Sequence, residues 1–295
     1  MKCRHCNKPL EKVFCNLISC PPANSLLNQE ELAQPESCLP LRIYVCTNCF
    51  LVQTDEIMSA REIFDQDYAY FSSFSASWLT HAQEYVEMMI QRFRFTRESQ
   101  VIEIASNDGY LLQYFKPYNI PVLGVDPTAN TAAAAKAKGI ETIVDFFGAE
   151  FALEKLVKRG IRADLIIGNN VLGHVPDIND FVEGLNIALG HKGTITMEFP
   201  HLVRLIEGKQ FDTIYHEHFS YLSCTTVGRI LKSRGLELFD VEELTTHGGS
   251  LRIFVKHQDD KSKSISTRVQ NLLEKEADAG ISHLSFYAGF QNEVD

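Results

Sequence analysis

The sequence lacks several features that would assign it to a class of protein at once. No apolar run approaches the roughly 20 residues that a membrane-spanning helix needs. The first six residues lack the apolar core of a secretory signal peptide. Positive charge is also scarce, because the 295-residue chain has a net charge of −10. A surface for nucleic acid would need the opposite balance. These absences predict a cytoplasmic protein with neither a membrane nor a nucleic-acid partner, and nothing in the sequence indicates an oligomeric state.

Two common nucleotide-binding fingerprints are also missing. Neither G-x-G-x-x-G nor G-x-x-x-x-G-K-[ST] occurs anywhere in the chain. However, an alternating apolar run at residues 101–105 turns through the polar segment Ser106–Gly109 and enters an expected helix at 110–115. A buried strand, a sharp polar turn and a helix start are typical of the entrance to a nucleotide-binding α/β sheet. The sequence therefore predicts a nucleotide-like ligand bound without either standard fingerprint.

Cysteine is concentrated at one end of the chain. Seven of the eight cysteines lie within the first 49 residues, and in a reducing compartment such a cluster indicates metal ligation better than disulfides. Cys3-x-x-Cys6 and Cys46-x-x-Cys49 form two pairs, whose four thiolates suit a closed, structural Zn²⁺ site. A four-sulfur site leaves no open position for catalysis. The alternative is that some of these cysteines are only small buried hydrophobic residues.

The cysteine pairs suggest a boundary near residue 55. We expect a zinc-binding domain over residues 1–55, in which the proline-containing segment 8–41 is an insertion with few core residues. Metal would stabilise a lobe of this kind. Residues 56–98 are expected to form a helical bridge, whose Tyr- and Ser-rich stretch at 68–74 could line a polar pocket.

From residue 99 onwards, strand-like apolar runs alternate with helical patterns, which predicts a doubly wound parallel sheet. Ligands bind such sheets at the carboxyl ends of the strands. Polar residues fall at these expected ends: Asp126, Asp145, Asn169, Asn170 and Glu198. Asp126 is placed to accept both ribose hydroxyls, and Asp145 with Phe146 to hydrogen-bond and flank an adenine. Each polar residue could instead be a helix cap or a turn residue.

A second polar cluster, Tyr215-His-Glu-His218, follows the last of these strands. Histidine is the side chain best able to take a proton near neutral pH, so the cluster favours acid–base chemistry. A metal site and purely structural histidines are the alternatives. On a strand, His216 and His218 would share one face with Glu217 opposite, and no third metal ligand lies nearby. Two further strands are expected at 236–244 and 250–257, joined by a hairpin at His247.

In combination, these motifs resemble the class I S-adenosylmethionine-dependent methyltransferases. More narrowly, the chain is similar to the sugar C-methyltransferases that carry an N-terminal zinc-binding domain. The resemblance rests on the two cysteine pairs and on residues 103–110, 169–177, 215–218 and 247–252, which together cover almost the whole chain. It implies an α/β fold with a Rossmann-like, seven-stranded, mostly parallel sheet over residues 99–257 and an antiparallel last strand.

The resemblance also implies a reaction. Such enzymes methylate nucleotide-activated, dTDP-like 4-keto-6-deoxy sugars at C3, and the sugar nucleotide would be the partner molecule. His218 would be the base that removes the C3 proton, and Tyr215, Glu217 and His174 would orient it or hold the enolate and hydroxyls. Tyr70 would contact the sugar. The S-adenosylmethionine site would comprise Glu103, Ser106, Asn107, Gly109, Asp126, Asp145, Phe146 and Asn169, and the zinc ligands would be Cys3, Cys6, Cys46 and Cys49.

Two other functions remain open at this point. One keeps the cofactor but transfers the methyl group to oxygen or nitrogen of another small metabolite. The other is a non-catalytic zinc and methyltransferase-like scaffold that binds a protein. The resembling enzymes continue into a second Rossmann-like domain, so residues 258–295 are expected to be a helical tail that starts a C-terminal domain absent from this chain.

Overall fold

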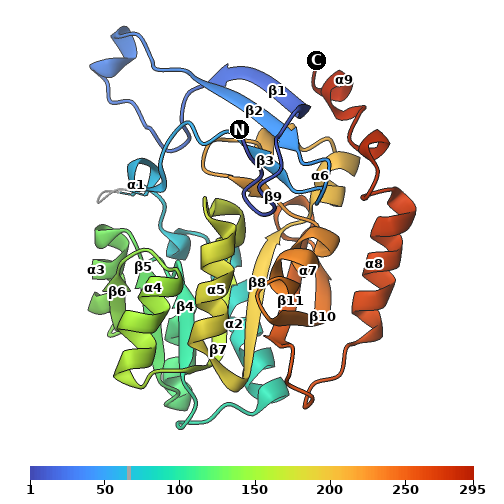
Figure 1. Cartoon of the computed structure of the whole chain (residues 1–295). Coiled ribbons are helices and arrows are strands. Elements are labelled where there is room, and N and C mark those ends of the chain that lie inside the picture. The colour runs from blue at the N-terminus through green and yellow to red at the C-terminus, as the bar shows by residue number, and fades with distance from the viewer. Residues whose placement is uncertain (65–67) are drawn as a thin grey trace.

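The computed structural model describes residues 1–64 and 68–295. Its strands form two sheets, a four-stranded one in the order β1-β2-β3-β9 and a seven-stranded one in the order β10-β11-β8-β7-β4-β5-β6 (Figure 1). The strands are β1 Lys12–Cys20, β2 Leu39–Val45, β3 Val52–Thr54, β4 Val101–Ile104, β5 Val122–Asp126, β6 Thr142–Val144, β7 Ala163–Asn169, β8 Leu189–Pro200, β9 Ser220–Tyr221, β10 Leu236–Leu244 and β11 Ser250–His257.

The α-helices are α1 Ala60–Ile63, α2 Ala76–Phe93, α3 Ala129–Ala137, α4 Ala149–Phe151, α5 Ile178–Ala188, α6 Leu202–Glu207, α7 Cys224–Lys232, α8 Thr267–Ala279 and α9 Phe290–Val294. The helix expected at 110–115 is a 3-10 helix, Leu112–Tyr118. The expected bridge 56–98 includes residues 65–67, which lie outside the described residues. Within the described ranges, no helix combines the length and apolar character that crossing a bilayer requires.

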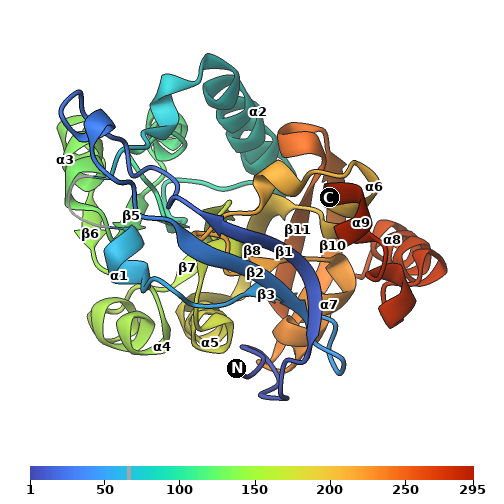
Figure 2. The same ribbon diagram turned by 90° about the horizontal axis from the view of Figure 1, so that it is seen from above.

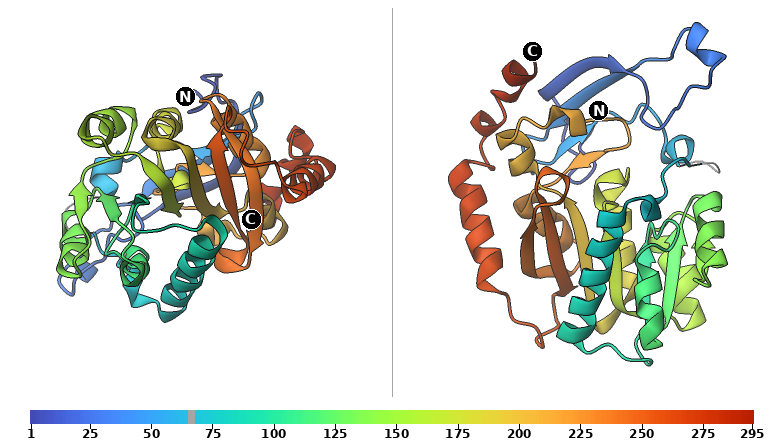
Figure 3. Two further views of the ribbon diagram at one scale, coloured as in Figure 1. Left: turned by 90° about the horizontal axis from the view of Figure 1, so that it is seen from below. Right: turned by 180° about the vertical axis from the view of Figure 1, so that it is seen from behind.

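The large sheet confirms the fold class expected from the sequence. Strands β7, β4, β5 and β6 pair in parallel, as do β7 and β8, whereas β11 runs antiparallel to both β8 and β10. Helix α2 covers one face, and α4, α5 and α7 cover the other (Figures 2 and 3). The antiparallel strand β11, inserted between β8 and β10, completes the seven-stranded order.

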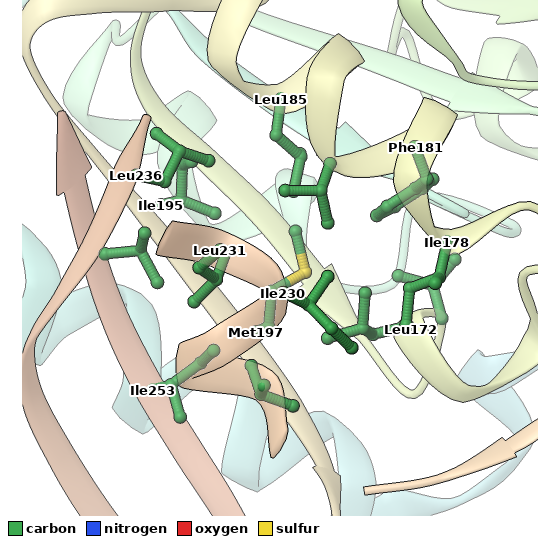
Figure 4. Close-up of a cluster of buried hydrophobic side chains, with 14 of the residues drawn as sticks. Leu172, Ile178, Phe181, Leu185, Ile195, Met197, Ile230, Leu231, Leu236 and Ile253 are labelled. Carbon is green, nitrogen blue, oxygen red and sulfur yellow. The ribbon is translucent and has the colours of Figure 1, made fainter. Parts of the chain in front are cut away.

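Apolar periodicity explains how the helices attach to the sheet. Helix α5 begins at the N-cap Asp177, whose side chain accepts a bond from the Asp180 amide, and it buries Phe181 and Leu185 four residues apart. These side chains pack with residues of β8 and α7 in one cluster (Figure 4). Helix α2 buries Tyr85 and Met89 against the opposite face of the sheet. The two clusters hold the strand ends in register, which positions the site described below.

The N-terminal lobe differs from the expectation. The segment expected to be an insertion with few core residues forms the antiparallel pair β1–β2. Its buried face packs against α6 and the end of the chain, with the ring of Phe14 stacked on that of Phe290 at 4.6 Å between centroids. The apolar partners of β1 are therefore supplied by distant segments, and the β1–β2 register is interrupted at two places.

The lobe sheet is completed by β9, which comes from the middle of the chain. Strand β3 pairs with β9, so that Gln53 lies opposite Ser220 and Val52 opposite Tyr221. The N-terminal sheet thus includes the segment that directly follows the Tyr215–His218 cluster. Viewed from above, this sheet lies over the large sheet (Figure 2).

Helix α8 is joined to the body of the large sheet by Glu276, a carboxylate only 1% exposed. Its oxygens accept hydrogen bonds from His201 Nε2 at 2.7 Å and from the backbone amides of Cys224 and Thr225, both also at 2.7 Å. The last two donors are the first residues of α7, so Glu276 satisfies amide groups that a helix start leaves free. Burial raises the pKa of this carboxyl, but the bonds from His201 and Thr225 outweigh it and lower the pKa overall.

We predict that Glu276→Gln lowers the free energy of unfolding by about 1–3 kcal/mol at pH 7, because the charge that strengthens these bonds is lost. A group whose pKa is lowered by folding contributes stability above its unfolded pKa and loses it as the pH falls through the folded value. The difference from wild type should therefore narrow below about pH 4. Urea denaturation at both pH values tests this, with the exposed Glu274→Gln of the same helix as the control. Equal stability of wild type and Glu276→Gln at pH 7 would contradict the assignment.

Candidate active site

A cavity of about 880 Å³ opens at the carboxyl ends of the parallel strands. It is lined by the turns after β4, β5, β6 and β7 on one side and by the Tyr215–His218 segment on the other. Two loops of the N-terminal half, around Asn24 and around Tyr68–Ser72, close it from above. This is the place where doubly wound sheets bind nucleotides.

Five of the eight residues predicted to bind the cofactor line this cavity: Asn107, Asp126, Asp145, Phe146 and Asn169. Asp126 is held in place because its Oδ1 accepts bonds from the amide of Thr128 at 2.9 Å and from the hydroxyl of Thr131 at 3.0 Å. Asn169 Nδ2 donates to the hydroxyl of Tyr110 at 3.3 Å, while its Oδ1 is buried without a partner among the described residues. An orphaned acceptor beside a cavity fits a ligand that brings hydrogen-bond donors.

The other three, Glu103, Ser106 and Gly109, do not line the cavity. Gly109 has φ +75°, and a Cβ added there would lie 2.4 Å from Ile140 Cδ1, so this glycine is required by the turn and by packing. Ser106 lies beside β5 and is fully buried. Glu103 is also fully buried, and neither carboxylate oxygen has a partner among the described residues. Burial raises the pKa of Glu103 well above its usual range, and the nearby Tyr110 hydroxyl only partly offsets this.

The side chain of Asn107 is engaged in an internal contact. Its Oδ1 accepts from the amide of Ser72 at 2.8 Å and its Nδ2 donates to the carbonyl of Tyr70 at 3.0 Å. Lys138 supports the same segment, since its Nζ contacts Ser73 Oγ at 2.8 Å. The predicted cofactor residue thus also fixes residues 70–72 across the cavity, and the expectation that the Tyr- and Ser-rich stretch lines a pocket is confirmed for Tyr68, Tyr70 and Ser72.

Glu198 does not join the ligand groups expected at the strand ends. Arg252 Nε donates to its Oε1 at 2.6 Å, and His81 Nε2 lies 2.9 Å from its Oε2. Burial alone would raise the pKa of Glu198, but His81 and Arg252 lower it, so the carboxylate stays charged inside this network. The sequence correctly placed Glu198 at a strand end. Its expected role as a ligand group is wrong, because the side chains of Arg252 and His81 already occupy its oxygens.

The Tyr215–His218 segment is a turn rather than a strand, with the amide of His218 bonded to the carbonyl of Tyr215 at 3.1 Å. Tyr215, Glu217 and His218 therefore all line the cavity. His216 is buried outside it, and its Nε2 lies 3.2 Å from the carbonyl of Pro40. The strand geometry considered above, with both histidines on one face, is wrong, and His216 is the structural histidine of the pair.

The protonation state of His218 follows from one contact. Its Nδ1 lies 2.9 Å from the carbonyl oxygen of Thr213, which can only accept, so Nδ1 carries the hydrogen and Nε2 keeps its lone pair. Burial, together with His174 and His247, lowers the pKa of His218 well below its usual range. The ring is therefore neutral at pH 7 and has one nitrogen free to accept a proton.

Aromatic rings surround this histidine. The ring of Tyr215 lies 4.0 Å from that of His218, and the ring of His174 lies 4.6 Å away in an edge-on arrangement. Burial lowers the pKa of His174 to about 4, so this second imidazole is also neutral. Burial and the charge of Glu217 raise the pKa of Tyr215, which keeps its phenol protonated and able to donate.

Glu217 contacts two residues that were not among the individually predicted site residues. Its Oε1 accepts from Asn24 Nδ2 at 2.8 Å and its Oε2 from the Tyr68 hydroxyl at 3.3 Å. Burial raises the pKa of Glu217, and these two bonds partly offset the rise. Tyr68 belonged to a stretch already marked by its hydroxyls, whereas Asn24 lies 193 residues away from Glu217 in the chain and no local pattern singles it out.

The four predicted metal ligands come together. The sulfurs of Cys3, Cys6, Cys46 and Cys49 lie within 4.8 Å of one another, with 3.5 Å between Cys3 and Cys49. Zn–S bonds of about 2.3 Å in a tetrahedron place sulfurs about 3.8 Å apart, so the donor set fits zinc. Gln53 Nε2 also donates to Cys3 Sγ at 3.3 Å, as an outer partner of a thiolate should. Among the described residues, this is the one cluster of metal-ligand type, which removes support for a second metal at His216 and His218.

Comparison with known families agrees with this arrangement. Residues 3–64 match a profile described as a putative zinc binding domain, residues 78–241 a methyltransferase domain, and residues 245–295 a C-methyltransferase C-terminal domain. The middle match covers more than half of the chain, and the last one includes β11 and α8.

Among curated relatives, the C-methyltransferase NovU of Streptomyces niveus is 32% identical over 289 residues, which cover 98% of this chain and 68% of NovU. Solved structures resemble the chain more distantly. Magnesium protoporphyrin IX methyltransferase of Synechocystis, determined with bound SAH, is 14% identical with a TM-score of 0.48 and aligns over 66% of this chain and 91% of its own. Protein PH0226 of Pyrococcus horikoshii is also 14% identical, with a TM-score of 0.49 over 64% and 94% of the two chains.

We predict that the purified protein contains one zinc ion per chain and that Cys6→Ser removes it, because one thiolate is lost from a closed four-sulfur site. Elemental analysis after dialysis measures this. Cys38→Ser is the matched control, since Cys38 is exposed and lies outside the cluster. Zinc retained at full occupancy in Cys6→Ser would contradict the ligand set.

We predict that Phe146→Ala weakens binding of S-adenosylhomocysteine by about 10- to 100-fold, the effect of removing an aromatic face from a base. The ring of Phe146 lines the cavity beneath the guanidinium of Arg61 at 5.5 Å. Calorimetric titration measures the affinity. Phe74→Ala serves as the control, because Phe74 is 82% exposed and does not line the cavity. Unchanged affinity in Phe146→Ala would exclude the adenine contact.

Proposed function

The chain belongs to the family of S-adenosylmethionine-dependent C-methyltransferases that carry a zinc-binding domain, and we propose that it methylates C3 of a nucleotide-activated, dTDP-like 4-keto-6-deoxy sugar through an enolate. The observation that carries this proposal is the neutral His218, whose hydrogen is fixed on Nδ1 and whose Nε2 has no hydrogen-bond partner among the described residues. It lines the same cavity as the residues expected to bind the cofactor.

Carbon becomes a nucleophile only after a proton next to a carbonyl group is removed. In the proposed reaction, Nε2 of His218 takes the proton from the carbon next to the ketone, and the electron pair of that C–H bond moves into the enolate. The low pKa means that imidazolium alone is disfavoured in this pocket. The proton transfer therefore requires that the enolate charge stabilise the imidazolium as an ion pair.

Donors are available for the enolate oxygen and the sugar hydroxyls. The phenol of Tyr215 stays protonated, because burial raises its pKa, and its ring lies against that of His218. His174 is neutral and can offer one N–H and one acceptor nitrogen. Glu217, held by Asn24 and Tyr68, would accept a hydrogen bond from a hydroxyl of the sugar or, in its protonated form, donate one. Tyr70 lines the cavity with a half-exposed ring that fits the proposed sugar contact.

S-adenosylmethionine would supply an electrophilic methyl group on its sulfonium. Asp126 would hold the ribose, and Asp145 and Phe146 the adenine. Asn169, whose Oδ1 has no partner in the described part of the chain, would hold the polar methionine end. Glu103 does not line the cavity, and we propose that it acts indirectly, as a buried carboxyl group close to the lining residue Tyr110. Ser106 and Gly109 would shape the turn.

The charges of the cavity favour entry of the sugar ring alone. Among the described lining residues, Arg61 is the single lysine or arginine, whereas six are acidic: Asp126, Asp145, Asp177, Asp180, Asp212 and Glu217. A diphosphate requires cationic or amide partners. We therefore propose that the ring carrying the ketone enters the cavity while the nucleotide diphosphate stays at its mouth.

Methyl transfer to oxygen or nitrogen and a non-catalytic scaffold remain outcomes of the test rather than proposals, since no specific contact favours either. The cytoplasmic location expected from the sequence stays a prediction.

We predict that His218→Ala lowers kcat by about 10²- to 10⁴-fold, the usual contribution of a positioned base. Labelled S-adenosylmethionine is incubated with a panel of dTDP-4-keto-6-deoxy sugars, and NMR locates the methyl group on the product. In D₂O without methyl donor, the wild-type protein should also exchange the C3 hydrogen for deuterium, and His218→Ala should not.

A control variant and a binding measurement show whether the effect is specific to His218. His216→Ala is the neighbouring control, because His216 lies outside the cavity, and it should retain exchange if the protein folds. S-adenosylhomocysteine affinity should be similar in all three proteins. A His218→Ala protein that methylates at the wild-type rate would eliminate the base, and a methyl group found on oxygen would replace the C3 proposal.

A further inference from the structure

One residue of the zinc knuckle reaches beyond the metal site. Arg4 stands between Cys3 and Cys6, and its side chain is only 8% exposed. Its Nη1 donates to the carbonyl of Thr54 at 2.7 Å, and its guanidinium lies 5.2 Å from the ring centre of Phe219. The first contact is with the last residue of β3, and the second is with the residue that directly precedes β9. A buried guanidinium can make them together because it is planar and carries several donors.

The strand that Arg4 contacts holds the proposed base. Thr54 lies at the end of β3, and its Oγ1 donates to the carbonyl of His218 at 3.3 Å. Its amide donates to the carbonyl of Phe219 at 3.1 Å. Phe219 follows His218 directly and leads into β9, where Ser220 pairs with Gln53. The backbone carbonyls of His218 and of the residue after it are thus both bonded to β3.

The side chain of Gln53 connects β3 to the turn that carries the metal ligands. This side chain is fully buried, its Oε1 accepts from the backbone amide of Arg4 at 2.9 Å, and its Nε2 donates to Cys3 Sγ at 3.3 Å. The knuckle turn Cys3–Cys6 takes its shape when the four sulfurs share one metal. A defined knuckle gives Arg4 a defined position against the end of β3. Gln53 bonds the same knuckle from within β3, so both residues link the knuckle to the strand pair beside His218.

We propose that Arg4 is a positioning residue, which with Gln53 ties the occupied zinc knuckle to the turn that bears His218. Zinc then fixes where the His218 ring stands and not only whether the lobe folds. The consequence for catalysis rests on the proposed function, whereas the mechanical connection does not.

The test compares Arg4→Met and Arg4→Lys with the wild-type holoprotein. Arg42→Met is the matched control, since Arg42 is an exposed arginine of the same lobe that contacts Tyr44. Three properties are measured in each protein: zinc content, affinity for S-adenosylhomocysteine, and the ring ¹⁵N and ¹³C signals of His218, assigned by comparison with His218→Ala. Wild type should show the tautomer with hydrogen on Nδ1.

We expect Arg4→Met to keep its zinc and its cofactor affinity, while the His218 signals shift toward a mixture of tautomers. Its kcat should fall by about 10- to 100-fold with little change in KM for the methyl donor, since a displacement of about 1 Å has an effect of this size. Arg4→Lys should recover part of the rate, because lysine restores the donor to Thr54 but not the planar contact with Phe219.

Native His218 signals in a zinc-loaded Arg4→Met protein would overturn the proposal. If Arg4→Met loses its zinc, Arg4→Lys decides the question, because native His218 signals and rate in Arg4→Lys would then assign Arg4 to lobe folding alone. Altered His218 signals together with an unchanged kcat would uphold the connection and reject His218 as the base, so the two proposals fail separately.

Discussion

The pairing of β3 with β9 is the constraint on which the site depends. Only two residues of β9 take part, yet they join the sheet of the zinc lobe to the chain segment that leaves the large sheet after β8. The Tyr215–His218 turn is held between these two bodies. Without this pairing, the carboxyl ends of the parallel strands would still form one side of the cavity. The opposite side, which is the Tyr215–His218 turn, would not be held in position.

The two walls of the cavity come from different parts of the fold and carry different chemical groups. The carboxyl ends of β5, β6 and β7 supply oxygen acceptors on a rigid sheet. The facing wall supplies imidazole, phenol and carboxyl groups whose pKa values are shifted by burial in the direction of the neutral form. A pocket with neutral acids and bases suits proton transfer, because no strong ion pair has to be broken before the proton moves.

The sequence predicted the large sheet well because its strands are apolar runs separated by turns. It failed for β1, whose apolar partners, such as Phe290, lie at the other end of the chain. For the candidate site, the sequence predicted which polar residues lie at the strand ends. It did not predict which of them are already bonded by other side chains. Glu198 is taken by Arg252 and His81, and no local pattern reveals such a pairing. The side chains of His216 and His218 lie in different places because the backbone turns between them. Asn24 is distant from Glu217 in the chain, and only the tertiary fold brings the two into contact.

The contact between β1 and the last helix has a consequence for how the protein is made. Asn16 and Gln291 are hydrogen-bonded although 275 residues separate them. At a translation rate of about 5–20 residues per second, the first of these leaves the ribosome roughly 14 to 55 seconds before its partner. All four cysteines of the zinc site emerge long before that time. The nascent lobe can therefore take up metal early. The apolar face of β1 stays uncovered until the residues around Phe290 are synthesised, and it needs protection from aggregation in the interval.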